Sequence, residues 1–126
     1  MKTTTEIGRY GESVAVEYLK SKKYKIVDKN FHASHNEIDI IAEDKKYIVF
    51  VEVKARSFNP NSNYEYDTPA SAVTYSKQKR VLAAAQAYLN AHPTKKTPRL
   101  DVIEIYLSRD PVEVVKINHI EDAFSN

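Results

Sequence analysis

The chain has no cysteine, no tryptophan and no hydrophobic run long enough to cross a membrane as a helix. The lack of cysteine excludes disulfides, thiolate metal sites and cysteine-based catalysis. Residues 1–6 lack the apolar stretch of a secretory signal peptide. We therefore expect a cytoplasmic protein that makes no contact with membranes.

The chain also lacks a strong excess of charge of either sign. Its 19 basic and 17 acidic residues give a net charge of +2, so total charge does not indicate nucleic-acid binding. Basic residues nevertheless form three short clusters, at residues 20–25, 77–80 and 95–99. Each cluster fits either a solvated surface or contacts with the phosphates of a nucleic acid.

The length of 126 residues and the hydrophobic content of 42% fit one domain, residues 1–126, with a single core. The spacing of apolar and turn residues predicts a helix, three strands, a second helix and two more strands. The expected elements are a helix from a Thr3 N-cap to about Lys22, a strand at 24–31, a polar connection at 32–36, strands at 36–42 and 49–54, a helix at 75–91, strands at 100–107 and 112–117, and a short helix at 119–124. This order predicts an α/β fold with a mixed central β-sheet flanked by helices.

Two adjacent segments that read as buried strands contain charged residues. Residues 36–42 include Asp39, and residues 49–54 include Glu52 and Lys54, all among β-branched or aromatic neighbours. A charge in such a run is costly unless it is paired or binds a metal ion. The two segments therefore predict either a cross-strand ladder of salt bridges or a metal-binding site.

The short link between these two segments predicts a β-hairpin. If residues 45–46 form its tip, residues whose numbers sum to 91 face each other. Asp39 then lies opposite Glu52. In the same register Glu37 lies opposite Lys54, so that three carboxylates and one ammonium group converge on one patch.

Two segments outside the charged hairpin carry residues whose roles stay open. Residues 57–69 form a long irregular stretch with two prolines, in which Tyr64 and Tyr66 either stack on nucleic-acid bases or fold onto their own domain. In the strand at 100–107, we expect Asp101 to contact Arg99, a lysine or a helix end.

The charged hairpin belongs to a wider set of motifs. Twelve residues separate Asp39 from Glu52-Val53-Lys54, and this pattern resembles the PD-(D/E)xK nucleases, the restriction-endonuclease-like superfamily. Further motifs along the chain are Gly8-x-x-Gly11-Glu12, Tyr18-Leu19, Tyr24-x-Ile26, Asn30, Glu37-Ile38-Asp39-x-Ile41-Ala42, Val49-Phe50-Val51-Glu52-Val53-Lys54-x-Arg56 and Arg99-Leu100-Asp101-Val102-Ile103. Together they resemble the small bacterial YraN-type family, which is thought to be nuclease-like and similar to archaeal Holliday-junction resolvases.

The chain departs from that family at one position. The family usually has glycine before Glu-Ile-Asp, whereas this chain has Asn36. Asparagine is the residue that best replaces glycine where the backbone needs a positive φ. We therefore expect a positive φ at Asn36 and the same turn as in the family.

The resemblance implies a restriction-endonuclease-like domain and a site that binds Mg²⁺, with Mn²⁺ as a substitute. It implies that Asp39 and Glu52 bind the metal directly, helped by the main-chain carbonyl of Val53. Lys54 would orient the attacking water or stabilise the transition state, and Glu12 would bind through a water or a second metal. The residues expected to support these groups or to contact the substrate are Glu37, Arg56, Lys77 and Gln78.

The resemblance therefore predicts that the chain is a metal-dependent endodeoxyribonuclease, which hydrolyses phosphodiester bonds of branched or structured DNA in repair or recombination. A homodimer is expected of the resolvase branch, and a protein partner is expected if substrate must be delivered. Two alternatives stay open: a non-catalytic nucleic-acid-binding module of the same fold, and an interaction or scaffold protein. Neither the choice between DNA and RNA nor that between endo- and exonuclease follows from the sequence.

Overall fold

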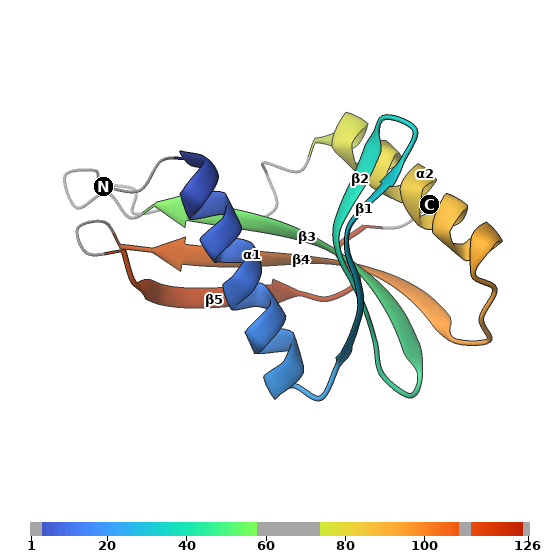
Figure 1. The fold of residues 1–126 in the computed structure, drawn as a ribbon, viewed down its shortest axis with the longest axis horizontal. Helices are drawn as coiled ribbons and strands as arrows, with labels where there is room; N and C mark the ends of the chain where they lie inside the picture. Colours follow the sequence, from blue (N-terminus) through green and yellow to red (C-terminus); the bar gives the residue numbers. More distant parts are fainter. Residues whose placement is uncertain (1–3, 58–73, 109–111, 125–126) are drawn as a thin grey trace.

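The computed structural model describes residues 4–57, 74–108 and 112–124. These residues form two helices and a five-stranded sheet (Figure 1). The elements in chain order are α1 (Thr4–Ser21), β1 (Lys25–Ala33), β2 (Asn36–Glu43), β3 (Tyr47–Ser57), α2 (Tyr75–Ala91), β4 (Thr97–Leu107) and β5 (Val114–Ile120). The α/β fold with a mixed sheet is thereby confirmed, and it is consistent with a restriction-endonuclease-like fold.

The strands lie in the sheet in the same order as in the chain, β1-β2-β3-β4-β5. Neighbouring strands are antiparallel except for β3 and β4, which are parallel and are joined through α2. A parallel pair needs such a long crossover, because a tight turn can only reverse the chain. Strand β4, which lies between β3 and β5, is buried from Arg99 to Leu107 and forms part of the core of the molecule.

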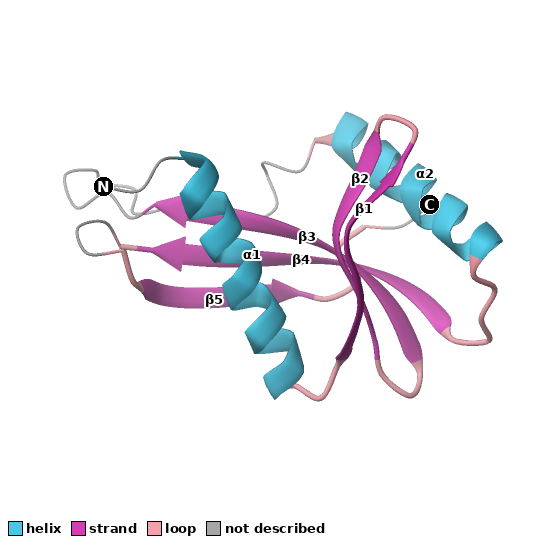
Figure 2. Ribbon diagram, in the orientation of Figure 1, coloured by secondary structure: helices cyan, strands magenta, loops and turns pink. Residues whose placement is uncertain are grey.

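The two helices cover opposite faces of the sheet (Figure 2). Helix α1 packs through Ala15 and Leu19 on side chains of β2, β3 and β4 that include Ile40 and Ile103. On the other face, α2 packs through its buried residues Val81, Ala84, Ala85 and Tyr88 on a second cluster. In the described part of the chain, neither helix is long and apolar enough to span a membrane.

The hairpin of β2 and β3 has the predicted register. Its ladder runs from Ile40–Val51 to Glu43–Ile48, so the paired numbers sum to 91. The turn is held by Asp44, whose Oδ1 accepts hydrogen bonds from the backbone N–H groups of Lys46, at 2.8 Å, and Tyr47, at 2.7 Å. An Asp side chain that closes a turn in this way fixes the register locally.

Several element boundaries differ from the prediction. The polar connection predicted at 32–36 is only a two-residue turn, because β1 extends to Ala33 and β2 begins at Asn36. The positive φ predicted at Asn36 was wrong: Ser34 has it, with a φ of 59°, since the turn residues are 34–35. The short helix predicted at 119–124 was also wrong, because β5 continues to Ile120 against β4 and a turn follows.

The predicted contact of Asp101 with Arg99 is confirmed, and it is part of a buried polar cluster. Asp101 is fully buried, and Arg99 donates to both of its carboxylate oxygens, at 2.9 and 2.8 Å. Arg99 also donates to the Tyr24 hydroxyl at 2.7 Å, and His119 Nε2 lies 2.6 Å from Asp101 Oδ2. The predicted helix cap residue Thr3 and the tyrosines 64 and 66 lie outside the described residues.

These partners also set the charge state of Asp101. Burial alone would raise its pKa, but hydrogen bonds from His119 and Arg99 hold the pKa of this carboxyl below its ordinary value. The folded protein therefore stabilises the ionised form. That stabilisation is present above the ordinary aspartate pKa and is lost as the pH falls through the folded-state pKa.

We expect Asp101→Asn to lower the free energy of unfolding at pH 7 by about 3–5 kcal/mol, because it removes the buried counter-charge of Arg99 and leaves only the exposed Glu121. The difference from the wild type should shrink as the pH falls below about 4, because the unfolded wild-type chain then binds a proton at Asp101 that the folded protein does not readily accept. Urea unfolding at pH 7 and pH 3.5 measures both values. Glu17→Gln, at an exposed ion pair with Lys20, is the matched control and should change stability by less than about 1 kcal/mol. An equal effect of the two substitutions would contradict the structural role of Asp101.

Candidate active site

The candidate site lies where β2 separates from β3. In the described residues no β2–β3 pair precedes Ile40–Val51, and from there toward its start β2 pairs only with β1. We call this point, between residues 39–40 of β2 and 51–53 of β3, the β2–β3 fork. The predicted ladder pairs Asp39–Glu52 and Glu37–Lys54 were therefore wrong, because the two strands separate just before the first of these pairs could form.

Asp39 fills the opening with its side chain. Its Oδ2 accepts a hydrogen bond of 2.8 Å from the backbone N–H of Val53, a group left without a partner strand on that side. A buried backbone N–H needs an acceptor, so this bond compensates for the end of the ladder. It also holds the Asp39 carboxylate near Glu52, the residue that precedes Val53 in β3.

Glu52 is almost completely buried and is shared by two ammonium groups. Its Oε1 lies 3.6 Å from Lys54 Nζ and 3.4 Å from Lys77 Nζ. Its Oε2 is buried and has no hydrogen-bond partner among the described residues. A buried carboxylate oxygen without a donor is costly, so this atom points to a ligand that the chain itself does not supply.

A close contact between α1 and β3 brings Glu12 to the site. Gly11 of α1 faces Ala55 of β3, and a Cβ atom at Gly11 would lie 3.1 Å from the Ala55 Cβ. Such a distance is tighter than ordinary van der Waals contact, so only glycine lets the helix backbone lie this near to the strand. Glu12, the next residue, is then held above the β2–β3 fork.

Glu12 and Glu37 lie on either side of Asn30. The amide nitrogen of Asn30 is 3.1 Å from Glu12 Oε1 and 3.1 Å from Glu37 Oε1, with the amide oriented so that its nitrogen faces both carboxylates. The opposite orientation would place its oxygen against two carboxylate oxygens, which is repulsive. Glu37 thus contacts Asn30 of β1 at the rim of the site, whereas its predicted place was opposite Lys54.

Two carboxylates of the site, Asp39 and Glu12, have raised pKa values. The pKa of Asp39 is raised to about 7, first by burial and then by the negative charge of Glu52. The pKa of Glu12 is also raised, by burial and by the charges of Asp39 and Glu37. A group of like charges with little solvent attracts a cation strongly and costs stability while the cation is absent.

The structure thus brings Asp39, Glu52, Lys54 and Glu12 together, as predicted. Lys77, predicted as a supporting residue, reaches the centre of the site from the first turn of α2. Arg56 follows Lys54 on the same face of β3 and is half-buried, and Gln78 is half-buried beside Lys77. Asn30 was missed as a site residue. Its only signal was a polar residue in a strand that also belongs to a family motif.

The site offers two carboxylates, Asp39 and Glu52, to a small hard cation. No group of three or more carboxylate or histidine side chains in the described ranges is arranged so that all could bind one ion. Mg²⁺ needs only one or two carboxylates, because it keeps several of its waters. Asp39 and Glu52 satisfy that need, and the unpartnered Glu52 Oε2 is the atom best suited to it.

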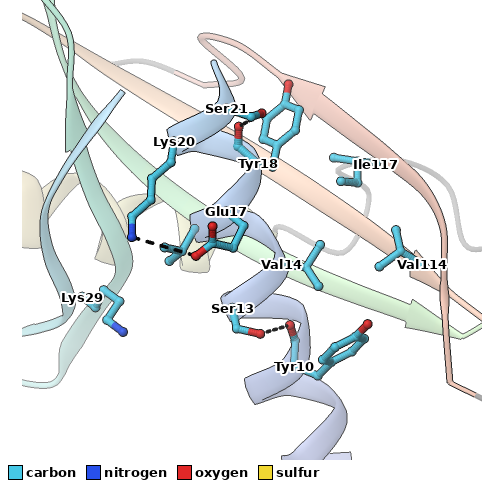
Figure 3. A pocket seen from close by; sticks show the side chains of 11 residues that line it. Tyr10, Ser13, Val14, Glu17, Tyr18, Lys20, Ser21, Lys29, Val114 and Ile117 are labelled. Carbon is cyan, nitrogen blue, oxygen red and sulfur yellow. Dashed lines mark hydrogen bonds and ion pairs between the residues drawn. The ribbon is translucent and has the colours of Figure 1, made fainter. Parts of the chain in front are cut away.

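A hollow elsewhere on the described surface differs in chemistry from the carboxylate site. An open groove beside α1 is lined largely by apolar and aromatic side chains, among them Tyr10, Val14 and Ile117 (Figure 3). Its charged residues are Glu17, Lys20 and Lys29, and neither Glu12 nor Glu52 lines it. The groove is therefore separate from the carboxylate site.

The raised pKa of Asp39 predicts an unusual pH dependence of stability. Between the ordinary aspartate pKa of about 4 and about 7, the folded protein keeps a proton on Asp39 that the unfolded chain has released, so stability falls as the pH rises through this window. Asp39→Asn removes the charge and keeps an oxygen for the Val53 N–H. We expect this variant to be more stable than the wild type at pH 8, by a few kcal/mol, and nearly equal to it at pH 4.

Denaturant unfolding at pH 4, 6 and 8 gives these differences. Asp28→Asn, at an exposed carboxylate of β1, is the control and should leave stability unchanged at all three values. A loss of stability in Asp39→Asn at pH 8 would contradict the electrostatic description of the site.

Comparison with known proteins places these residues in a family. The model of the uncharacterised protein family UPF0102 matches residues 11–105, a range that contains Glu12, Asn30, Asp39, Glu52 and Lys77. A UPF0102 protein of Caldanaerobacter subterraneus subsp. tengcongensis is 41% identical over 119 residues, which cover 94% of this chain and 93% of the relative.

Two further UPF0102 proteins show a similar likeness. One from Clostridioides difficile is 42% identical over 120 residues, covering 94% of this chain and 96% of the relative. One from Chlorobium chlorochromatii is 40% identical over 125 residues, covering 97% and 93%. The resemblance to the YraN-type family is thereby confirmed, and the chain belongs to the uncharacterised protein family UPF0102.

Proposed function

We propose that the chain is a metal-dependent nuclease that hydrolyses phosphodiester bonds, with Mg²⁺ or Mn²⁺ as cofactor. The observation that supports this most is the buried, unpartnered Oε2 of Glu52 at the β2–β3 fork, next to Asp39 and two ammonium groups. A carboxylate pair that is ready for a cation, with lysines around it, is the chemistry that phosphodiester hydrolysis needs.

The carboxylates would hold the cation. Asp39 and Glu52 would bind it directly with help from the Val53 carbonyl, and Glu12 would bind through a water or a second ion. When bound, the cation supplies positive charge to the reacting phosphate and lowers the pKa of an attacking water. The bond from Val53 N–H to Asp39 Oδ2 fixes one carboxylate oxygen, so that the second oxygen keeps a constant direction.

The two lysines would act on the substrate. Lys54 and Lys77 both contact Glu52 Oε1, so each ammonium group is within reach of a phosphate bound at the carboxylates. Lys54 would orient the attacking water or stabilise the negative charge that develops on the phosphate oxygens. Lys77 would bind a non-bridging phosphate oxygen.

The position of Lys77 in α2 supports this role. The first turn of α2 contains no acidic residue and begins after the N-cap Thr74, whose side chain accepts from the Lys77 N–H. A lysine there opposes the helix dipole, and a negative charge near it is favourable. Glu52 supplies that charge in the structure, and a phosphate would supply it in the complex.

The substrate class rests on the resemblance to the resolvases. We propose that the substrate is DNA with a branched or otherwise structured form, cut internally during repair or recombination. With a net charge of only +2, the chain would recognise DNA by local contacts near the site rather than by a large basic surface.

The test is a cleavage assay with Mg²⁺ or Mn²⁺ on labelled four-way junctions, flaps, single strands and linear duplex. We expect the wild type to cut at least one of these DNAs. Glu52→Gln should cut at least about 100-fold more slowly than the wild type, because it removes a charged ligand and its transition-state stabilisation. A chelator should abolish the activity of the wild type.

Two outcomes would contradict the proposal. Equal cutting by the wild type and Glu52→Gln would show a contaminating nuclease. Binding of DNA without cutting by either protein would favour the alternative of a non-catalytic nucleic-acid-binding module.

Lys77→Met tests the role of the second ammonium group. We expect cleavage to slow by about 10- to 100-fold, because a phosphate contact in the transition state is lost. Lys79→Met is the matched control: Lys79 lies in the same turn, but its ammonium group lies over the ring of Tyr75, 4.7 Å from the centroid. It should cut within about threefold of the wild type, as an exposed residue remote from the reaction. Equal effects of the two substitutions would indicate general DNA attraction instead of a specific contact.

A further inference from the structure

Asn30 joins carboxylates from two different elements. Asn30 belongs to β1, Glu12 to α1 and Glu37 to β2. The single amide nitrogen of Asn30 lies 3.1 Å from an oxygen of each carboxylate. An amide group has two N–H bonds, so it can donate one to each of them at the same time.

The backbone of β1 is shaped for this contact. Asn30 has a φ of 51°, in the left-handed region, where asparagine is tolerated better than other residues with a side chain. It lies between the pairs Lys29–Ile40 and Phe31–Ile38 of the β1–β2 ladder, and hence opposite Asp39. The strand thus presents an amide group at the point where the candidate metal ligand lies.

We propose that Asn30 is a positioning residue that holds Glu12 and Glu37 together and keeps Glu12 beside Asp39 in a divalent-cation site. This proposal rests on the proposed function, in which Glu12 contributes to cation binding. The buried and unpartnered Glu52 Oε2 is an independent sign of a ligand at the same place.

We call the pair of hydrogen bonds from Asn30 to Glu12 and Glu37 the clamp. The clamp offsets the repulsion between carboxylates at the site. Glu12 is half-buried on α1, and the charges of Asp39 and Glu37 both oppose its ionisation. Without a donor, an ionised Glu12 would turn away from the other two carboxylates toward water. A hydrogen bond to each of Glu12 and Glu37 offsets this repulsion.

An amide suits this task better than an ammonium group. A lysine at this position would also bind both carboxylates, but its charge would cancel the attraction for a metal ion. The Asn30 amide donates hydrogen bonds and carries no net charge. The site therefore keeps its negative potential while its carboxylates keep their places.

NMR spectroscopy of the metal-free protein tests the clamp directly. The two side-chain N–H signals of Asn30 are assigned by their loss in Asn30→Asp. We expect Glu12→Gln and Glu37→Gln each to shift these signals, because each removes the charge from one acceptor. Glu17→Gln, on the exposed side of α1, should leave them in place. Signals that move in neither Glu12→Gln nor Glu37→Gln would overturn the clamp.

Calorimetric titration with Mn²⁺ tests the link to the cation site. Asn30→Gly keeps the positive φ and removes only the amide, so we expect Mn²⁺ affinity to fall about tenfold. Ser34→Gly is the matched control, because it places glycine at the other positive φ of the same hairpin, 59°, away from the carboxylates. It should bind Mn²⁺ as the wild type does.

The outcomes separate the two proposals. Unchanged Mn²⁺ affinity in Asn30→Gly, with normal binding by the wild type, would overturn the positioning role and leave the proposed function standing. No Mn²⁺ binding by the wild type would overturn the proposed function and the cation role of Asn30 together. In that case the NMR signals would still show whether the clamp itself exists.

Discussion

The candidate site depends on the point at which β2 leaves β3. Past the pair Ile40–Val51 the ladder ends, and a backbone N–H of β3 at Val53 would be left without an acceptor. The Asp39 carboxylate takes that place at 2.8 Å. This one hydrogen bond therefore ends the hairpin without an unsatisfied buried group, and it also fixes an acidic side chain beside Glu52.

The same arrangement lowers the stability of the metal-free protein. Asp39 has a pKa of about 7, and Glu52 has a buried oxygen without a donor, so the metal-free protein stabilises neither carboxylate fully. The Arg99–Asp101 cluster shows the opposite case, in which every charge has close partners. Buried charges that are paired stabilise a fold, and buried charges that are incompletely paired are typical of sites that bind something.

The sequence predicted the residue types of the site better than its geometry. Asp39 and Glu52 could be identified from the sequence, because a charged residue in an apolar strand is costly unless it is paired or binds a metal ion. Periodicity gives the register of a hairpin but not the residue at which its ladder ends. The prediction that Asp39 and Glu52 face each other in the ladder was therefore wrong. The positive φ was expected at Asn36 by analogy with glycine, but the short turn places it at Ser34. The role of Asn30 needs three elements in contact, and no local pattern contains that information.

The central claim is that the β2–β3 fork binds a divalent cation between Asp39 and Glu52. The most direct test is a crystal soaked in Mn²⁺, with anomalous scattering used to locate the ion. The account predicts a peak about 2.1 Å from an oxygen of each carboxylate, with Lys77 moved away from Glu52. A fork that keeps the Lys77–Glu52 contact and shows no Mn²⁺ peak would contradict the account.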